Sequence, residues 1–203
     1  MRTAGSSLGN IFRELSNHNI INYIDCMHRK HIQCEEYCES QLQGSWRSGI
    51  KISTTREPYE NTVSLFVRAN GIKGVGMNVS KLQANATPEQ KATVIKTFRS
   101  RLKARDNYMM REMKRQGEIL FGPSGKIAHD YIVRFETLNQ DILRVLTDLD
   151  LLDSAKELKH YNYYLKRFTS KKDIDIDEWF DKETKDIVYN LREKEFKEFK
   201  YPR

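Results

Sequence analysis

The sequence is poor in cysteine and has no long apolar run. Its three cysteines, Cys26, Cys34 and Cys38, lack the CxxC spacing that is common in zinc and redox sites. Cys34 and Cys38 would share one face of a helix, but no second pair of ligands accompanies them, so all three are interpreted as small buried hydrophobic residues. No apolar stretch approaches the roughly 20 residues that span a bilayer. These absences argue against a disulfide framework, a zinc site and a membrane-spanning segment.

Two other common signals are absent as well. The GxxxxGK[ST] motif of kinases and ATPases does not occur, which argues against metal-assisted phosphoryl transfer. The first residues place Arg2 and Arg13 around small polar residues instead of the apolar core of a secretory signal, so we expect a cytoplasmic protein. The chain has 203 residues and no internal repeat or low-complexity tract, and we expect one domain over residues 1–203.

The sequence does have an excess of positive charge. Lysine and arginine number 35 against 28 aspartates and glutamates, a formal net charge of +7. Such a chain attracts an anionic partner. The net charge alone does not decide whether that partner is nucleic acid, an acidic membrane face, a polyanionic sugar or a multiply phosphorylated nucleotide.

The order of predicted elements alternates strands with helices. Apolar, β-branched runs predict strands at 20–27, 50–55 and 127–135. Apolar periodicity and capping residues predict helices that start near Leu8, cover 31–42, follow Pro58, follow Thr87, follow Thr137 and cover 182–199. This alternation predicts an α/β domain with a mostly parallel sheet, in which ligands bind beyond the carboxyl ends of the strands.

Three of these helices carry more detailed expectations. The first should bury Leu8, Ile11, Phe12 and Leu15, and the helix after Thr137 should bury one stripe formed by Leu138, Ile142, Val145, Leu146 and Leu149. The helix after Thr87 is expected to be long and very basic, ending at about Arg115. It is preceded by residues 71–86, whose glycines predict a loop able to cover a site.

Two segments have the composition of anion-binding sites. RTAGSS, residues 2–7, lies directly before the first helix, where backbone N–H groups and the helix dipole favour a phosphate. Arg56 ends the second predicted strand, and Ser64 follows eight residues later on the next helix. Arginine offers a planar fork to phosphate oxygens and serine adds a neutral donor. The alternative for Arg56 is an ordinary surface pair with a glutamate, which contributes little to stability.

Together, RTAGSS and TTREPYENTVSLF resemble the two donor-binding signatures of the sulfotransferases that use PAPS (3'-phosphoadenosine-5'-phosphosulfate). Residues 116–138 resemble the strand-to-helix segment of that family, and residues 179–201 resemble its closing helix. The branch that the sequence is most similar to is the carbohydrate type, which includes the heparan and dermatan sulfate O-sulfotransferases and bacterial relatives. The resemblance implies a P-loop-type α/β fold and transfer of a sulfuryl group from PAPS to a carbohydrate hydroxyl.

The resemblance also implies roles for individual residues. Arg2 would replace the usual lysine at the 5'-phosphate and bridging oxygen, and Arg56 and Ser64 would bind the 3'-phosphate. The remaining donor-binding residues would be Thr3, Ala4, Gly5, Ser6 and Ser7 of the loop and, in a basic segment that closes over the nucleotide, Lys166, Arg167, Lys171 and Lys172.

Catalysis in this scheme needs a base that accepts the proton of the attacking hydroxyl. His28 follows the first predicted strand, and its ordinary pKa of about 6.5 suits proton transfer near neutrality. His31 and Glu35 are the alternatives, and a purely structural role for His28 stays open. The products are PAP and a sulfated glycan, the acceptor is expected to be anionic, and no metal or nucleic acid is expected.

One feature departs from the family. Its phosphate loop follows a buried strand, whereas here the loop begins at residue 2. We therefore expect either that the natural start lies upstream of Met1 or that this chain is a weak or inactive donor binder. The competing hypothesis is a nucleic-acid- or polyanion-binding module that uses the basic side chains of the long helix, which are Arg99, Arg101, Lys103, Arg105, Arg111, Lys114 and Arg115.

Overall fold

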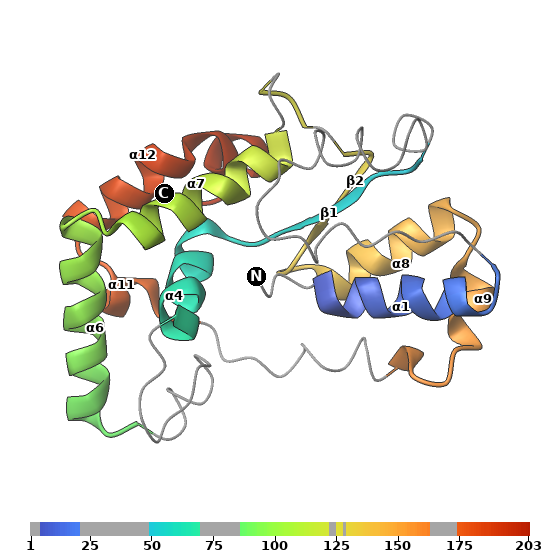
Figure 1. Ribbon diagram of the computed structural model, residues 1–203, viewed down its shortest axis with the longest axis horizontal. Coiled ribbons are helices and arrows are strands. Elements are labelled where there is room, and N and C mark those ends of the chain that lie inside the picture. Colours follow the sequence, from blue (N-terminus) through green and yellow to red (C-terminus); the bar gives the residue numbers. More distant parts are fainter. Residues whose placement is uncertain (1–4, 21–48, 70–85, 122–124, 128, 163–173) are drawn as a thin grey trace. The chain divides into compact units, whose positions relative to one another are not determined.

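The computed structural model describes residues 5–20, 49–69, 86–121, 125–127, 129–162 and 174–203 (Figure 1). The strand predicted at 20–27, the helix predicted at 31–42 and the loop predicted at 71–86 lie outside this part of the chain, apart from single residues at their ends. The described residues divide into two compact units. The sheet unit draws on Arg2–Arg56 and Glu118–Ser170, and the helical unit on Glu57–Gly117 and Lys171–Arg203. The single domain expected over 1–203 stays a prediction.

The sheet unit contains two parallel strands, β1 (Ile52–Thr55) and β2 (Tyr131–Arg134). Ile52 pairs with Tyr131 and Thr55 with Arg134. Asp130 anchors their amino ends, because its Oδ2 accepts a hydrogen bond from Lys51 N at 2.6 Å and its N donates to Lys51 O at 2.8 Å. The two predicted strands are confirmed at shorter lengths than expected. Parallel strands with helices make the described structure broadly α/β.

One face of this sheet packs against α8 (Leu138–Asp148) and joins one apolar core with α1 (Gly5–Asn17) and α9 (Leu152–Lys156). Val133 of β2 is fully buried among the predicted apolar stripes of α1 and α8, and both stripes are confirmed, with Leu149 partly buried. Figure 1 shows α1 and α8 both beginning on the side of the sheet toward which β1 and β2 run. The helix N-termini therefore lie at the carboxyl edge of the strands.

The predicted side-chain cap of α8 does not form. Thr137 occupies the N-cap position, but its hydroxyl does not cap the helix. It donates instead to Asp141 Oδ2 at 2.9 Å, and the same oxygen accepts from Arg134 N at 2.8 Å. Asp141, in the first turn, thus joins the end of β2 to α8.

The helical unit contains α4 (Pro58–Ala69), α6 (Pro88–Lys103), α11 (Ile176–Trp179), α12 (Lys182–Phe199) and most of α7 (Asn107–Phe121). Its core is aromatic. The ring of Phe98 meets Trp179 edge-on at 5.4 Å and Phe66 at 5.2 Å between centroids, and all three side chains are buried. Such edge-to-face pairs add to the free energy gained by burial alone. None of the described helices is long and apolar enough to cross a bilayer.

One predicted capping box and the predicted bounds of one helix are confirmed in this unit. Thr87 Oγ1 accepts from Gln90 N at 3.2 Å, and Gln90 Oε1 accepts from Thr87 N at 2.9 Å, which is the predicted capping box of α6. The terminal helix α12 has the predicted bounds and begins with a second box between Asp181 and Thr184.

The long basic helix predicted after Thr87 is wrong, because the chain forms α6 and α7 as separate helices. Arg105 between them has φ 52°, a left-handed conformation that ends α6. Asp106 then begins α7, with its Oδ1 accepting from Met109 N at 3.1 Å. Arg101 holds the same carboxylate through two bonds to Oδ2, at 3.1 and 2.7 Å.

Replacing Asp106 with Ala removes both the cap of α7 and the partner of Arg101. We expect the free energy of unfolding to fall by about 1–2 kcal/mol, the usual cost of a lost N-cap. The matched control is Asp153→Ala, since Asp153 forms an exposed pair with Lys156, and such surface pairs contribute about 0–1 kcal/mol. Urea unfolding measures both variants, and equal losses would contradict the capping role of Asp106.

Candidate functional site

Arg56 lies immediately beyond the carboxyl end of β1. Its side chain is buried, with the residue only 4% exposed, and its Cζ lies 4.5 Å from the centroid of the Phe135 ring. Phe135 follows β2 and continues the ladder, because its N donates to Thr55 O at 2.9 Å. A guanidinium stacked on an aromatic face is held by cation–π attraction. Arg56 is therefore a buried residue, not the surface residue that the alternative interpretation assumed.

Strand geometry indicates the face of the sheet on which Arg56 lies. Side chains alternate between faces along a strand, so Arg56 shares a face with Ile52, and the register places Val133 on that face too. Val133 belongs to the same buried apolar cluster as the side chains of α1. The first backbone N–H groups of a helix have no partner within the helix and carry a partial positive charge. Arg56 and the first turn of α1 thus lie on the same face and toward the same edge of the sheet.

The other predicted site residues lie in different parts of the chain, and only some of them are among the described residues. The backbone of Gly5, Ser6 and Ser7 forms the first turn of α1. Ser64 is half-buried, about two turns into α4, and belongs to the helical unit, whereas Arg56 belongs to the sheet unit. The remaining predicted residues lie outside the described part of the chain, namely Arg2, Thr3, Ala4, His28, His31, Glu35, Lys166, Arg167, Lys171 and Lys172.

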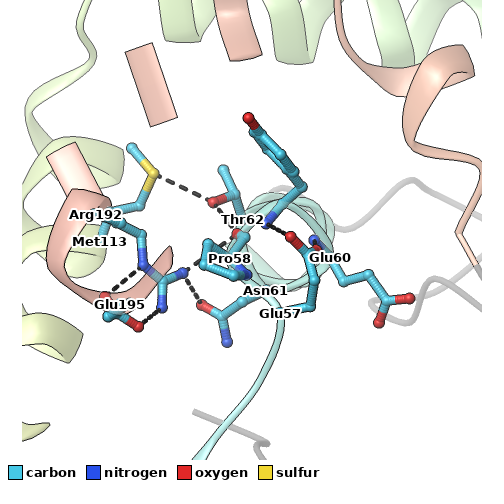
Figure 2. Close-up of polar contacts among 9 residues, drawn as sticks. Glu57, Pro58, Glu60, Asn61, Thr62, Met113, Arg192 and Glu195 are labelled. Carbon is cyan, nitrogen blue, oxygen red and sulfur yellow. Dashed lines mark hydrogen bonds and ion pairs between the residues drawn. The ribbon is translucent and has the colours of Figure 1, made fainter. Parts of the chain in front are cut away.

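Glu57 caps the helix that carries Ser64. Its Oε1 accepts from Tyr59 N at 3.1 Å and its Oε2 from Glu60 N at 2.6 Å, while its backbone O accepts from Asn61 N at 2.9 Å (Figure 2). Pro58 follows as the first residue of α4, a position where its missing N–H costs nothing. The tripeptide Arg56–Glu57–Pro58 therefore joins a buried cation, a helix cap and a helix start.

The Glu57 carboxyl is itself held away from water. Burial raises its pKa from 4.5 to about 7, with a smaller contribution in the same direction from the charge of Glu60. The hydrogen bonds from Glu60 and Tyr59, and the charge of Arg192, oppose this shift. The cap of α4 therefore titrates near neutral pH.

A buried ion pair that sequence reasoning missed lies beside this cap. Arg192 and Glu195, both on α12, have side chains 0% and 1% exposed. Arg192 Nε donates to Glu195 Oε1 at 2.7 Å, and Arg192 Nη2 is bonded to Glu195 Oε2. Gly117 of α7 is close enough to Glu195 that a Cβ on it would lie 3.5 Å from Oε1. The sequence signal that could have found this pair is the position of both residues on the buried helix face of Val188, Phe196 and Phe199.

The rest of the Arg192 guanidinium reaches α4. Its Nη1 donates to Pro58 O at 3.3 Å and to Asn61 Oδ1 at 3.2 Å, as Figure 2 shows. Thr62 Oγ1 also donates to Pro58 O, at 2.8 Å, and lies 3.3 Å from Met113 Sδ. The first turn of α4 is thus held by its own cap, by α12 and by α7.

The basic side chains of α6 bond largely within the chain. Arg99 donates to Trp179 O at 3.1 Å and to Glu178 O at 2.9 Å. Lys103 forms ion pairs with Asp181 and Glu183, both at 2.9 Å. Because α6 and α7 are separate helices and these cations join α6 to α11 and α12, the continuous basic helix of the polyanion hypothesis does not form. Among the described residues, no group of three or more His, Cys, Asp or Glu side chains is placed to hold a metal ion.

The described residues thus define an α/β protein with a parallel pair of strands, a buried arginine at their carboxyl edge and a capped, braced helix after it. No protein-family model matches the chain, and neither the curated proteins nor the solved structures include a significant match to it. The resemblance to sulfotransferases therefore depends on the motifs themselves.

Replacing Glu57 with Gln tests the buried carboxyl. An acid with a raised folded-state pKa binds more protons folded than unfolded, so its contribution makes stability fall as pH rises from about 4.5 to 7. We expect wild type to lose up to about 3 kcal/mol relative to Glu57→Gln between pH 5 and pH 8.

The control is Glu89→Gln, which changes an exposed carboxylate in the first turn of α6. Thermal unfolding at several pH values gives the comparison for both variants. A constant difference between wild type and Glu57→Gln across this range would contradict the raised pKa.

Proposed function

We propose that this protein is a PAPS-dependent sulfotransferase of P-loop type, which transfers a sulfuryl group to a hydroxyl of a carbohydrate. The observation that carries the proposal is the buried Arg56 at the carboxyl end of β1, on the face of the sheet covered by α1. The first turn of that helix contains the last three residues of the RTAGSS motif.

The geometry at Arg56 suits a phosphate. The Phe135 ring holds the guanidinium in place, with Cζ 4.5 Å from the ring centroid, and a guanidinium makes its bidentate bonds to phosphate oxygens in its own plane. Ligands of parallel α/β sheets bind beyond the carboxyl ends of the strands, and phosphates favour helix N-termini. A nucleotide with both a 5'-phosphosulfate and a 3'-phosphate would use the first turn of α1 for the one group and Arg56 with Ser64 for the other.

The proposed reaction is an in-line displacement at sulfur. The acceptor oxygen forms a bond to sulfur while the bond from sulfur to the bridging phosphate oxygen breaks, so PAP leaves with the bonding electron pair. His28 accepts the hydroxyl proton, with His31 and Glu35 as alternatives. Arg2 and the N–H groups of residues 3–7 stabilise the negative charge that develops on the leaving oxygen.

The acceptor is proposed to be an anionic glycan. The net charge of +7 favours a uronate-bearing or already sulfated sugar. A chain of this family that has lost catalysis would bind PAP without turning PAPS over, so binding and turnover must be measured separately.

PAP should stabilise the folded chain. At a free concentration 100 times its Kd, the expected gain in the free energy of unfolding is about 2.7 kcal/mol. Arg56→Lys and Ser64→Ala should reduce this gain, because each removes a proposed contact to the 3'-phosphate. Arg105→Lys and Ser100→Ala are the matched controls from an exposed part of the helical unit and should keep the gain.

Thermal scans with PAP and calorimetric titration measure these effects. A wild-type chain that is folded and shows no response to PAP would contradict donor binding. Turnover of PAPS with uronate-bearing glycans then separates an active enzyme from an inactive relative, and His28→Ala should abolish turnover while PAP binding persists.

A further inference from the structure

We propose that Arg192 is a positioning residue for the donor site: from the C-terminal helix it sets the position of the first turn of α4, and thereby of Ser64. This inference rests on the proposed function, since it assigns a task to the helix that carries the 3'-phosphate residue.

The contacts of Arg192 divide into two sets. Nε and Nη2 face Glu195 on the same helix, whereas Nη1 crosses to Pro58 O and Asn61 Oδ1 on α4. The first set neutralises the buried charge. The second set links α12 to the turn that begins two residues after Arg56, across 134 positions of sequence.

The backbone of α12 adapts to this contact. Arg192 has φ −121° and ψ 22°, outside the helical range, although the helix continues on both sides of it. Kinks in helices have local causes, such as a side chain that disturbs the regular ladder. Here the departure occurs at the one residue of α12 whose guanidinium bonds to the start of α4.

Stability alone gives a weak reason for such a pair. Replacing a buried ion pair by apolar residues of similar volume is often neutral or stabilising. The planar guanidinium of Arg192, however, bonds to a backbone carbonyl and a side-chain amide. Such directional bonds fix the orientation of the helix that they hold, which apolar packing leaves adjustable. Binding sites are sensitive to this, because a misplacement of about 1 Å can reduce function on the order of a hundredfold.

The double variant Arg192→Met with Glu195→Leu tests whether the ion pair sets the position of α4 separately from its effect on the stability of the fold. It removes both charges together and leaves no buried ion unpaired. We expect a melting temperature within about 5 °C of wild type. PAP should bind about tenfold or more weakly, and the KM for PAPS should rise more than kcat falls. The matched control is Lys197→Met with Glu193→Leu, an exposed pair on the same helix joined at 2.7 Å, and it should keep wild-type affinity.

Arg192→Lys provides a second test that does not depend on the double variant folding. Lysine retains a charge for Glu195 but lacks the fork that also reaches Pro58 O and Asn61 Oδ1. We expect weaker PAP binding and faster hydrogen exchange of the amides in residues 59–62.

The outcomes distinguish the two proposals. A wild-type chain that does not bind PAP overturns both of them. Wild-type binding that persists unchanged in folded Arg192→Lys, or in the folded double variant, overturns the role of Arg192 and leaves the sulfotransferase proposal standing.

Discussion

The charge of Arg192 must be satisfied without water, and the start of α4 depends on how this is done. Glu195 neutralises the guanidinium, while Pro58 O and Asn61 Oδ1 accept its remaining bonds. A buried charge that loses its partners is strongly destabilising, so these positions restrain one another. The aromatic core around Phe98 gives the helical unit its stability, but it is the polar contacts that select one position for the first turn of α4.

A second constraint acts in the sheet unit, where the two strands among the described residues need helices to cover them. The pair β1 and β2 is stable because α1 and α8 cover one face with continuous apolar stripes. The same packing turns both helix N-termini toward the edge where Arg56 lies. The feature that stabilises the sheet therefore also concentrates partial positive charge at the proposed donor site.

Features that depend on neighbouring residues were predictable from the sequence, and features that depend on distant ones were not. The capping box at Thr87 and the bounds of α12 follow from residues within one or two turns. The break at Arg105 is an exception, because its signal is local and was missed. Asp106 and Asn107 favour helix ends over helix interiors, and the bonds of Asp106 to Arg101 and Met109 lie within five residues. Arg192 was missed because a charged residue in a terminal helix is typically solvated, and its partner Pro58 is remote in sequence. At the proposed donor site, Arg56 was identified from the sequence, but its contact with Phe135, which follows the neighbouring strand, was not.

Part of the positive charge that a polyanion surface would use is neutralised within the chain. On α6, the charges of Lys91 and Lys103 are offset by Glu178, Asp181 and Glu183. By sequence, residues 99–115 have seven basic and two acidic residues, and the segment 163–173 has four basic residues and one acidic residue. This segment contains the four cations that the family resemblance assigns to the nucleotide. A polyanion module would spread its unbalanced charge along one exposed face, whereas a site for a compact, multiply phosphorylated nucleotide needs that charge concentrated in a few short segments.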